Sequence, residues 1–196
     1  MTKDDATVLG VAGRLFREKG FAATTVRDVA ATAGMLPGSL HYRFPTKDSL
    51  LVELMERGMV QAIERVRAAI EVEDTPLKKM RSALRAHLSL LVEGDDAIYV
   101  NLYEFRSVTG QARDRILRFR DAYEALWEGM LHAAVGAGVI RAGVDVRMVR
   151  FLLLGAVNWS AQWYEQSQGY TPEEVADAFF SISAFGFCDD DRGRST

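Results

Sequence analysis

The chain has 196 residues, of which 48% are hydrophobic and 26% are charged, and its formal net charge is −3. This length suffices for one large domain or two small ones, and the hydrophobic fraction excludes a generally disordered chain. Cys188 is the single cysteine, which excludes a disulfide framework and a cysteine-based zinc site. We find no basic and apolar leader, and the longest apolar stretch is about half of a membrane span. We therefore expect a soluble, cytoplasmic protein without a membrane partner.

The charges are distributed unevenly along the chain. Residues 1–50 hold seven basic and five acidic side chains, whereas the other 146 residues hold 17 basic and 22 acidic ones. A basic end on an otherwise acidic protein indicates contact with a polyanion at one place. A surplus of two charges also occurs on ordinary solvated surfaces, so this signal needs a second one.

Apolar residues follow a helical spacing along nearly the whole chain, and strand signals are nearly absent. This pattern predicts an all-α protein of about nine helices. Thr25, Thr46, Thr75 and Thr171 are expected N-caps, and Thr171 forms a capping box with Glu174. The polar residues 189–196 are expected to be a disordered tail. The helices are expected over residues 5–19, 26–33, 37–43, from 47 through at least 66, and over 76–93, 97–108, 111–137, 145–167 and 172–186.

The segment from Thr24 to Tyr42 fits a helix-turn-helix. Two short helices that cross steeply need a turn residue without a Cβ clash, and Gly34 meets this need. A short helix with small polar residues can enter the DNA major groove, which is about 12 Å wide. The alternative is an ordinary helical hairpin inside a bundle, whose outer face would be apolar rather than polar, aromatic and basic. The small core of the motif is expected to contain Val26, Val29, Ala30, Ala33, Met35, Leu40 and Phe44.

Residues from about 8 to 55 resemble the DNA-binding domain of TetR-family transcriptional regulators. The resemblance runs through Lys19-Gly20-Phe21, the segment Thr24 to Ala30, Gly38-Ser39-Leu40 and Lys47. It implies an all-α, dimeric protein whose larger C-terminal domain senses a small molecule. Two departures concern the DNA contacts. The family usually has Tyr at His41, and Leu36-Pro37 replaces a more frequent Ser-Lys pair.

This resemblance and the chemistry of the side chains predict three regions. These are a DNA-binding domain over residues 1–48, a ligand-binding and dimerisation domain over 49–188, and the tail. Thr25, Tyr42 and Lys47 are expected to contact phosphates, together with the N–H groups of Gly38 and Ser39. Ser39, His41 and Arg43 are candidates for base edges; Arg43 and Arg27 could instead contact phosphate. The alternative for each of these residues is an ordinary solvated polar side chain that does not contact DNA. The predicted DNA-binding residues are Thr25, Arg27, Pro37, Gly38, Ser39, His41, Tyr42, Arg43 and Lys47.

The last two long helices carry apolar residues on more than one face. A helix that is hydrophobic nearly all round has to be buried on two sides. In a body of this size, one side packs on its own domain and the other on a second copy. We therefore expect a homodimer through these helices, which would hold two recognition helices about 34 Å apart for two DNA half-sites.

The C-terminal region is also rich in aromatic residues, with polar groups among them at helical spacing. Apolar walls with a few polar anchors are typical of a small-molecule site, although aromatic stripes are as often ordinary core. The variant around Leu36 and the segment from Asn158 to Thr171 are similar to TetR-family branches that sense acyl-CoA or steroid-CoA thioesters. Gln162 stands where some members have an arginine for a CoA phosphate. The predicted ligand-binding residues are His87, Tyr99, Tyr103, Arg106, Phe119, Tyr123, Trp127, Asn158, Trp159 and Gln162.

Catalysis is not indicated. His41, His87 and His132 lie in separate predicted helices, and we find neither a glycine-rich phosphate loop nor a metalloprotease or nucleophile motif. We expect no catalytic residue, no metal and no cofactor. Two hypotheses follow: a repressor that a hydrophobic effector releases from its DNA operator, and a helical bundle that binds small molecules, as an enzyme or carrier, without binding DNA.

Overall fold

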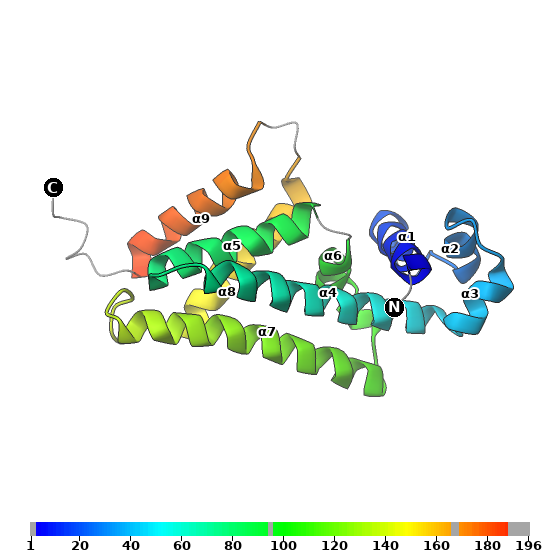
Figure 1. Ribbon diagram of the computed structural model, residues 1–196, viewed down its shortest axis with the longest axis horizontal. Helices are drawn as coiled ribbons and strands as arrows, with labels where there is room; N and C mark the ends of the chain where they lie inside the picture. Colours follow the sequence, from blue (N-terminus) through cyan, green and yellow to red (C-terminus); the bar gives the residue numbers. More distant parts are fainter. Residues whose placement is uncertain (1–2, 94–95, 166–168, 188–196) are drawn as a thin grey trace. The chain divides into compact units, whose positions relative to one another are not determined.

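The computed structural model describes residues 3–93, 96–165 and 169–187 of the chain (Figure 1). Nine α-helices and one 3₁₀ turn account for the helical structure of these residues, so the predicted all-α class is confirmed. The elements are α1 Lys3–Lys19, α2 Val26–Thr32, α3 Pro37–Arg43, α4 Lys47–Glu71, α5 Pro76–Glu93, α6 Ala97–Tyr103, η1 Phe105–Ser107, α7 Gly110–Gly136, α8 Val146–Trp163 and α9 Pro172–Phe187.

Two predicted helices differ from the structure by more than two residues. The helix expected over 97–108 is split into α6 and η1. The helix expected over 145–167 ends at Trp163, because the next residue, Tyr164, adopts an extended ψ of 122°. The Tyr164 hydroxyl then donates to the carbonyl oxygen of Tyr170 at 2.9 Å. The predicted tail 189–196 and Cys188 lie outside the described residues.

The chain divides into two compact units. The first unit comprises Met1–Gln61 and Gly94–Arg120, and the second comprises Ala62–Glu93 and Asp121–Thr196. The first unit therefore contains α1, α2, α3, the beginnings of α4 and α7, and α6 with η1. The functional boundary that the sequence suggests at residue 48 is a different division, and it stays a prediction.

The helix-turn-helix of the first unit follows from local sequence chemistry. The Thr25 hydroxyl accepts the Asp28 N–H at 3.1 Å, and the Asp28 carboxylate accepts the Thr25 N–H at 2.8 Å, which completes a capping box. Gly34 has a φ of +67°, a conformation that costs glycine little. Pro37 then occupies the first turn of α3, where its missing N–H has no helical partner in any case.

The core of the first unit brings α1, α2, α3 and α4 together with α6 and the start of α7. The predicted core residues Val29, Ala30, Leu40 and Phe44 are buried in it. Val26, Ala33 and Met35, also predicted, are partly buried and pack against the same cluster. The fully buried Leu40 fixes which face of α3 turns inward.

The crossing of α4 and α6 in the first unit is unusually close. A Cβ on Gly58 would lie 2.8 Å from the Cβ of Ala97 and 3.1 Å from its carbonyl carbon, so only glycine fits there. The buried Asn101 side chain donates from Nδ2 to the carbonyl oxygens of Met55 and Ala97, both at 2.9 Å. Close backbone contact and these two hydrogen bonds hold α6 against α4.

The second unit is a bundle in which α5 packs on α8 and α9, and α8 packs on α9 (Figure 1). Arg85 of α5 binds Asp177 of α9, with Nε 2.7 Å from Oδ1. The side chain of Arg150 on α8 is 4% exposed and pairs with Glu124 at 2.8 Å and Glu128 at 3.2 Å on α7. Within the described part of the chain, no helix combines the length and the apolar composition that a membrane crossing requires.

Candidate nucleic-acid interface and ligand sites

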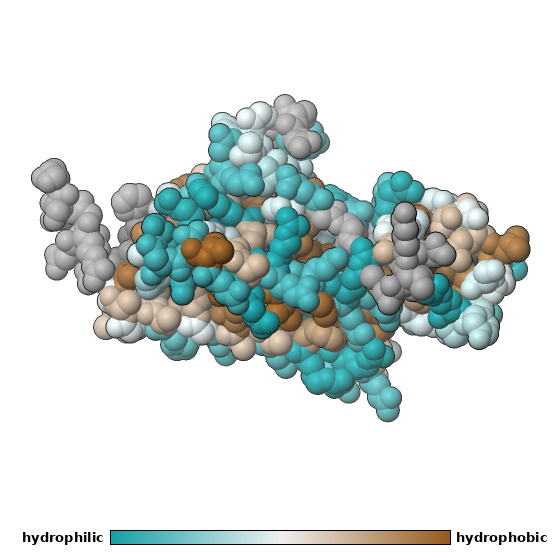
Figure 2. All heavy atoms as spheres, viewed as in Figure 1, coloured by the Kyte–Doolittle hydropathy of each residue, from teal (hydrophilic) through white to brown (hydrophobic). Residues whose placement is uncertain are grey.

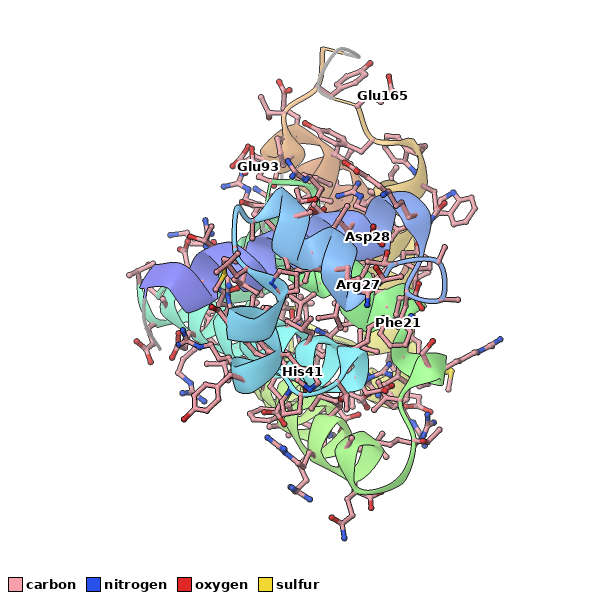
Figure 3. All side chains as sticks on the ribbon, turned by 90° about the vertical axis from the view of Figure 1, so that its right-hand side faces the viewer. Phe21, Arg27, Asp28, His41, Glu93 and Glu165 are labelled. Carbon is pink, nitrogen blue, oxygen red and sulfur yellow. The ribbon has the colours of Figure 1, made fainter. Side chains whose placement is uncertain are left out.

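The outer face of α3 is formed by exposed polar and aromatic residues. Ser39, His41, Tyr42 and Arg43 are all exposed, and Tyr42 reaches 92% of its full accessible surface. Leu40, between them, is completely buried. The hydrophilic side of α3 therefore turns outward, as the sequence predicts. Figure 3 faces this side and shows His41 of α3 and Arg27 of α2 together on it.

Apolar surface adjoins this face at the turn that precedes α3. Leu36 is 77% exposed there, and Pro37 and Gly38 beside it are also exposed. Figure 2 shows hydrophobic surface at the same end of the first unit. The Ser39 N–H donates to the carbonyl oxygen of Leu36 at 3.0 Å, so it does not remain open to a phosphate as the sequence analysis expects. The Gly38 N–H remains as the first-turn donor.

Thr25 and Arg27 occupy the start of α2, and both are exposed. The Thr25 hydroxyl donates to Asp28 Oδ2 at 2.7 Å, and its N–H donates to the same carboxylate oxygen at 2.8 Å. These hydrogen bonds from Thr25 lower the pKa of Asp28 below its ordinary value. Thr25 thus acts first as a helix cap, whereas the Arg27 guanidinium extends from the same surface.

The Lys47 side chain forms hydrogen bonds with the loop between α1 and α2. Its ammonium donates to the carbonyl oxygens of Phe21 at 2.7 Å and Ala22 at 3.2 Å, and it lies 4.3 Å from the centre of the Phe21 ring. The N–H of Phe21 donates in turn to Oε1 of Glu104, at 3.0 Å. An ammonium has three N–H groups, so one remains for a phosphate.

Four of the predicted ligand residues come together in the second unit. The ring of the buried His87 lies with Nδ1 2.8 Å from the Tyr123 hydroxyl and Nε2 2.8 Å from Oδ1 of Asn158. Because a carbonyl oxygen only accepts, Nε2 carries the proton and Nδ1 accepts from Tyr123. The Trp127 ring stands edge-on to both His87, at 6.3 Å, and Tyr123, at 6.2 Å. We call this group the His87 cluster.

Burial sets the protonation of the His87 cluster. It lowers the pKa of His87, an effect that the Asn158 hydrogen bond only partly opposes, and it raises the pKa of the Tyr123 hydroxyl. His87 is therefore neutral at pH 7. Trp127 Nε1 and Ser160 Oγ are among the buried polar atoms of this unit that have no hydrogen-bond partner within the described residues. Unpaired buried donors are costly and suit a ligand that carries an acceptor.

The structure places the other ligand candidates elsewhere. Trp159 is 65% exposed and Gln162 is exposed, so neither joins the His87 cluster. In the first unit, Tyr99 and Tyr103 stack on each other with ring centres 4.5 Å apart, and the Arg17 guanidinium lies 4.7 Å from the Tyr99 ring. Arg106 of η1 is exposed.

Phe119 lines a pocket of about 360 Å³ in the first unit together with Glu56, Arg115 and Arg118. Sequence reasoning missed these three charged residues. Arg115 and Arg118 belong to a segment, residues 106–120, in which five arginines stand against one acid, and this density is a signal for the two arginines but not for Glu56.

A second exposed apolar surface lies on α8 and α9. Met148, Phe151, Leu152 and Trp159 of α8 are 47–65% exposed, and Ile182 of α9 is 74% exposed. The α8 positions recur at helical spacing along one side of that helix. Among the residues that the structure describes, no three His, Cys, Asp or Glu side chains gather closely enough to hold a metal ion.

Two family models match this chain. Residues 8–54 match the family model for bacterial regulatory proteins of the tetR family, and residues 73–186 match the tetracyclin repressor-like C-terminal domain. The transcriptional repressor KstR2 of Rhodococcus jostii (strain RHA1) is 32% identical over 89% of this chain and 86% of its own. The fatty acid metabolism regulator protein of Bacillus subtilis (strain 168) is 26% identical over 91% of this chain and 93% of its own.

Among solved structures, AibR in complex with isovaleryl coenzyme A and operator DNA superimposes with a TM-score of 0.84. It is 26% identical, and the match covers 92% of this chain and 97% of AibR. The family models together extend over most of the chain, and the relatives are transcriptional regulators rather than enzymes. A bundle or enzyme without DNA binding is therefore not supported. This chain belongs to the TetR family, as a helix-turn-helix transcriptional regulator.

Proposed function

We propose that this regulator is a homodimeric repressor that binds an operator through α3 of each subunit and leaves the DNA when it binds a hydrophobic CoA thioester. The observation that carries the proposal is the outward polar face of α3 on a TetR-family chain. Relatives named as repressors support the direction of regulation. A protein that regulates bacterial genes in this way acts in the cytoplasm.

In this proposal, some residues at the α3 face contact phosphates and others contact base edges. Tyr42 and the remaining N–H of Lys47 contact phosphates, which fix the position of α3 in the major groove. Ser39 and His41 contact base edges, and Arg27 and Arg43 reach either kind of group. Leu40 anchors the helix from behind and has no contact with DNA.

The second copy would cover the exposed apolar side of α8 and α9. Phe151 of α8 lies under two guanidinium groups, those of Arg147 at 5.6 Å and Arg150 at 4.6 Å, so its ring is held in place before a partner arrives. Large apolar patches on soluble proteins are typical of interfaces between proteins. A two-fold axis through α8 and α9 would bury the same patch on both subunits.

The His87 cluster is the proposed anchor for the effector in the second unit. It combines aromatic walls with polar groups whose protonation is fixed at neutral pH, as described above. The unpaired Trp127 N–H and Ser160 hydroxyl can donate to the thioester carbonyl. AibR and the Bacillus subtilis FadR have been solved with isovaleryl-CoA and stearoyl-CoA respectively, which supports a thioester as the ligand class.

Titration of duplex DNA from the region upstream of the chain's own gene tests the function. Fluorescence anisotropy at several salt concentrations should show specific binding that weakens steeply as salt rises. Addition of medium- or long-chain acyl-CoA should release the DNA. Absence of specific binding to any upstream fragment contradicts the repressor, and unchanged binding in the presence of every acyl-CoA contradicts the effector class.

Substitutions on α3 sharpen that test. Tyr42→Phe should weaken binding to all sequences alike, by about 0.5–1.5 kcal/mol, because only the hydroxyl is lost. His41→Ala should change the relative affinity for different operator variants instead. Glu64→Gln, an exposed change on α4 in the second unit, is a matched control that should leave DNA binding as it is.

A further inference from the structure

The pocket in the first unit has chemistry that the proposed roles do not use. It has a volume of about 360 Å³ and is lined by Glu56 of α4 and by Arg115, Arg118 and Phe119 of α7. Sites for small molecules begin at about 300 Å³, so the pocket can hold a group of nucleotide size. Its lining combines two cations, one carboxylate and one aromatic ring.

The segment that supplies both arginines of the pocket is rich in arginine. Residues 106–120 hold five arginines against Asp114 alone, on a protein whose net charge is negative. Like charges one helical turn apart destabilise a helix unless something neutralises them. Arg113 and Arg120 are accounted for, because their guanidinium groups lie 4.2 and 4.4 Å from the centre of the Phe105 ring.

Arg115 and Arg118 differ in what they already bind. Arg115 forms an ion pair with Glu56, with NH2 at 2.7 Å from Oε2. Arg118 lies one turn further along α7 and is exposed, and within the described residues it has neither a hydrogen bond nor an ion pair. With Glu56 the two arginines give the pocket a net charge of +1. An anion is the group that would complete it.

Glu56 adds a requirement that a simple anion does not meet. Its Oε2 binds Arg115, but its Oε1 is shielded from solvent and has no donor within the described residues. A buried carboxylate oxygen without a donor is costly. The pocket therefore suits a ligand that brings an N–H or O–H donor as well as a negative charge.

Phe119 supplies the third feature, a flat apolar wall directly after Arg118 in the sequence. Aromatic side chains stack on nucleic bases of any kind. A phosphate for Arg118, an amino or hydroxyl group for Glu56 and a base for Phe119 occur together in a nucleotide. A fatty acid offers only a carboxylate, and inorganic phosphate offers no ring.

We propose that this pocket binds the phosphorylated nucleoside of a ligand, with Arg118 on a phosphate, Glu56 Oε1 on a donor of the base or ribose, and Phe119 against the base. The source of that chemistry is either the nucleotide end of an acyl-CoA or a free nucleotide. In the first case the inference rests on the proposed effector class. In the second it is a separate input to the same regulator.

Calorimetry on the full chain without DNA tests the site directly. The probes are 3′-phosphoadenosine 5′-diphosphate, which is the nucleotide part of CoA, together with ATP, pyrophosphate and an S-acyl pantetheine that lacks the nucleotide. We expect one of the two nucleotides to bind and pyrophosphate to bind more weakly. Arg118→Ala should weaken nucleotide binding about tenfold or more, since it removes a charge-assisted contact, and Arg118→Lys should restore part of it.

Two matched variants separate the nucleotide from a generic anion. Phe119→Leu should weaken nucleotide binding and leave pyrophosphate binding unchanged, because leucine keeps an apolar side chain but has no ring that can stack. Arg67→Ala, which removes the same charge from an exposed position on α4 in the second unit, should change neither. Equal binding of pyrophosphate and nucleotide, with no effect of Phe119→Leu, overturns the nucleotide assignment.

Release of operator DNA distinguishes this inference from the proposed function. If acyl-CoA releases the wild-type protein and Arg118→Ala at the same concentration, and no nucleotide binds, the pocket assignment fails while the effector class stands. If a nucleotide binds through Arg118 but acyl-CoA leaves the DNA complex intact, the effector class fails and a free nucleotide is the ligand. Stronger release by acyl-CoA than by S-acyl pantetheine, lost in Arg118→Ala, supports both.

Discussion

The two units stabilise their buried polar side chains in different ways. In the first unit, Thr24 donates to the carbonyl oxygens of Leu15 and Gly20, and Asn101 donates to two further main-chain carbonyls. In the second unit, His87 and Arg150 instead bind other side chains. A main-chain carbonyl neither ionises nor changes rotamer, whereas a side-chain partner can change rotamer and a carboxylate partner such as Glu124 can also ionise. The hydrogen bonds of these buried groups in the first unit are therefore insensitive to pH, whereas those in the second unit can respond to it.

The largest expected effect comes from the α4–α6 crossing of the first unit. Gly58→Val should lower the free energy of unfolding by about 3 kcal/mol, because the new side chain overlaps Ala97 and forces the helices apart. Chemical denaturation checks this value. Gly129→Ala, at an exposed position of α7 with open space around it, is the control and should not destabilise the chain. Equal effects of the two substitutions on the free energy of unfolding would contradict the close packing of α4 on α6.

Removal of a main-chain tie should have a smaller effect. Asn101→Ala deletes both hydrogen bonds that Nδ2 makes and leaves the Met55 carbonyl without this donor, at a cost of about 2 kcal/mol. The loss should be the same at pH 5 and pH 8, since neither partner titrates. A loss that varies with pH across this range would contradict the proposed difference between the units.

The stability of the second unit, in contrast, should depend on pH because of the His87 cluster. Burial lowers the pKa of His87 in the folded state, so below its ordinary value of 6.5 the unfolded chain binds a proton that the folded chain does not. The contribution of the neutral His87 to the free energy of unfolding is then fully present above about pH 6.5. It falls as pH decreases, with a limiting slope of about 1.4 kcal/mol per pH unit.

Thermal unfolding between pH 5 and 8 measures this slope. His87→Gln should remove it, whereas His132→Gln, a change at an exposed histidine of α7, should retain it. A wild-type protein whose unfolding temperature is constant over this range contradicts the buried neutral histidine.

The smallest effect is expected at the Arg85–Asp177 pair, whose side chains are 39% and 32% exposed. The hydrogen bond from Arg85 lowers the pKa of Asp177, so its contribution is present at neutral pH and is lost as pH falls below about 4. Solvent screening limits the contribution to about 0.5 kcal/mol. Asp177→Asn should cost this amount at pH 7 and progressively less as pH falls below about 4, as measured by urea unfolding.

The helix-turn-helix was predictable because its determinants are local. Thr25 with Asp28, Gly34 and Pro37 fix the ends of two helices within a short stretch of sequence, and the structure confirms their roles. The His87 cluster was partly predictable, since its four members were among the ligand candidates. Their hydrogen bonds were not, because they join helices far apart in the chain.

The arrangement of residues in the pocket of the first unit could not be predicted from the sequence, for the same reason. Glu56 and Arg115 belong to separate helices, and no periodicity indicates that they form an ion pair. Trp159 was predicted to bind the ligand because of its spacing among other aromatic residues. Helical spacing, however, does not indicate which face of α8 turns inward. The structure places Trp159 on the exposed side, beside the other apolar residues proposed for the dimer.

The main chain of Phe21 is held on both sides, because its N–H donates to Glu104 and its carbonyl oxygen accepts from Lys47. Any rearrangement near η1 therefore has to break one bond or carry the α1–α2 loop along. In a ¹⁵N-labelled sample without operator DNA, the hydrogen-exchange rate of the Phe21 amide proton would report whether a rearrangement near η1 changes this contact.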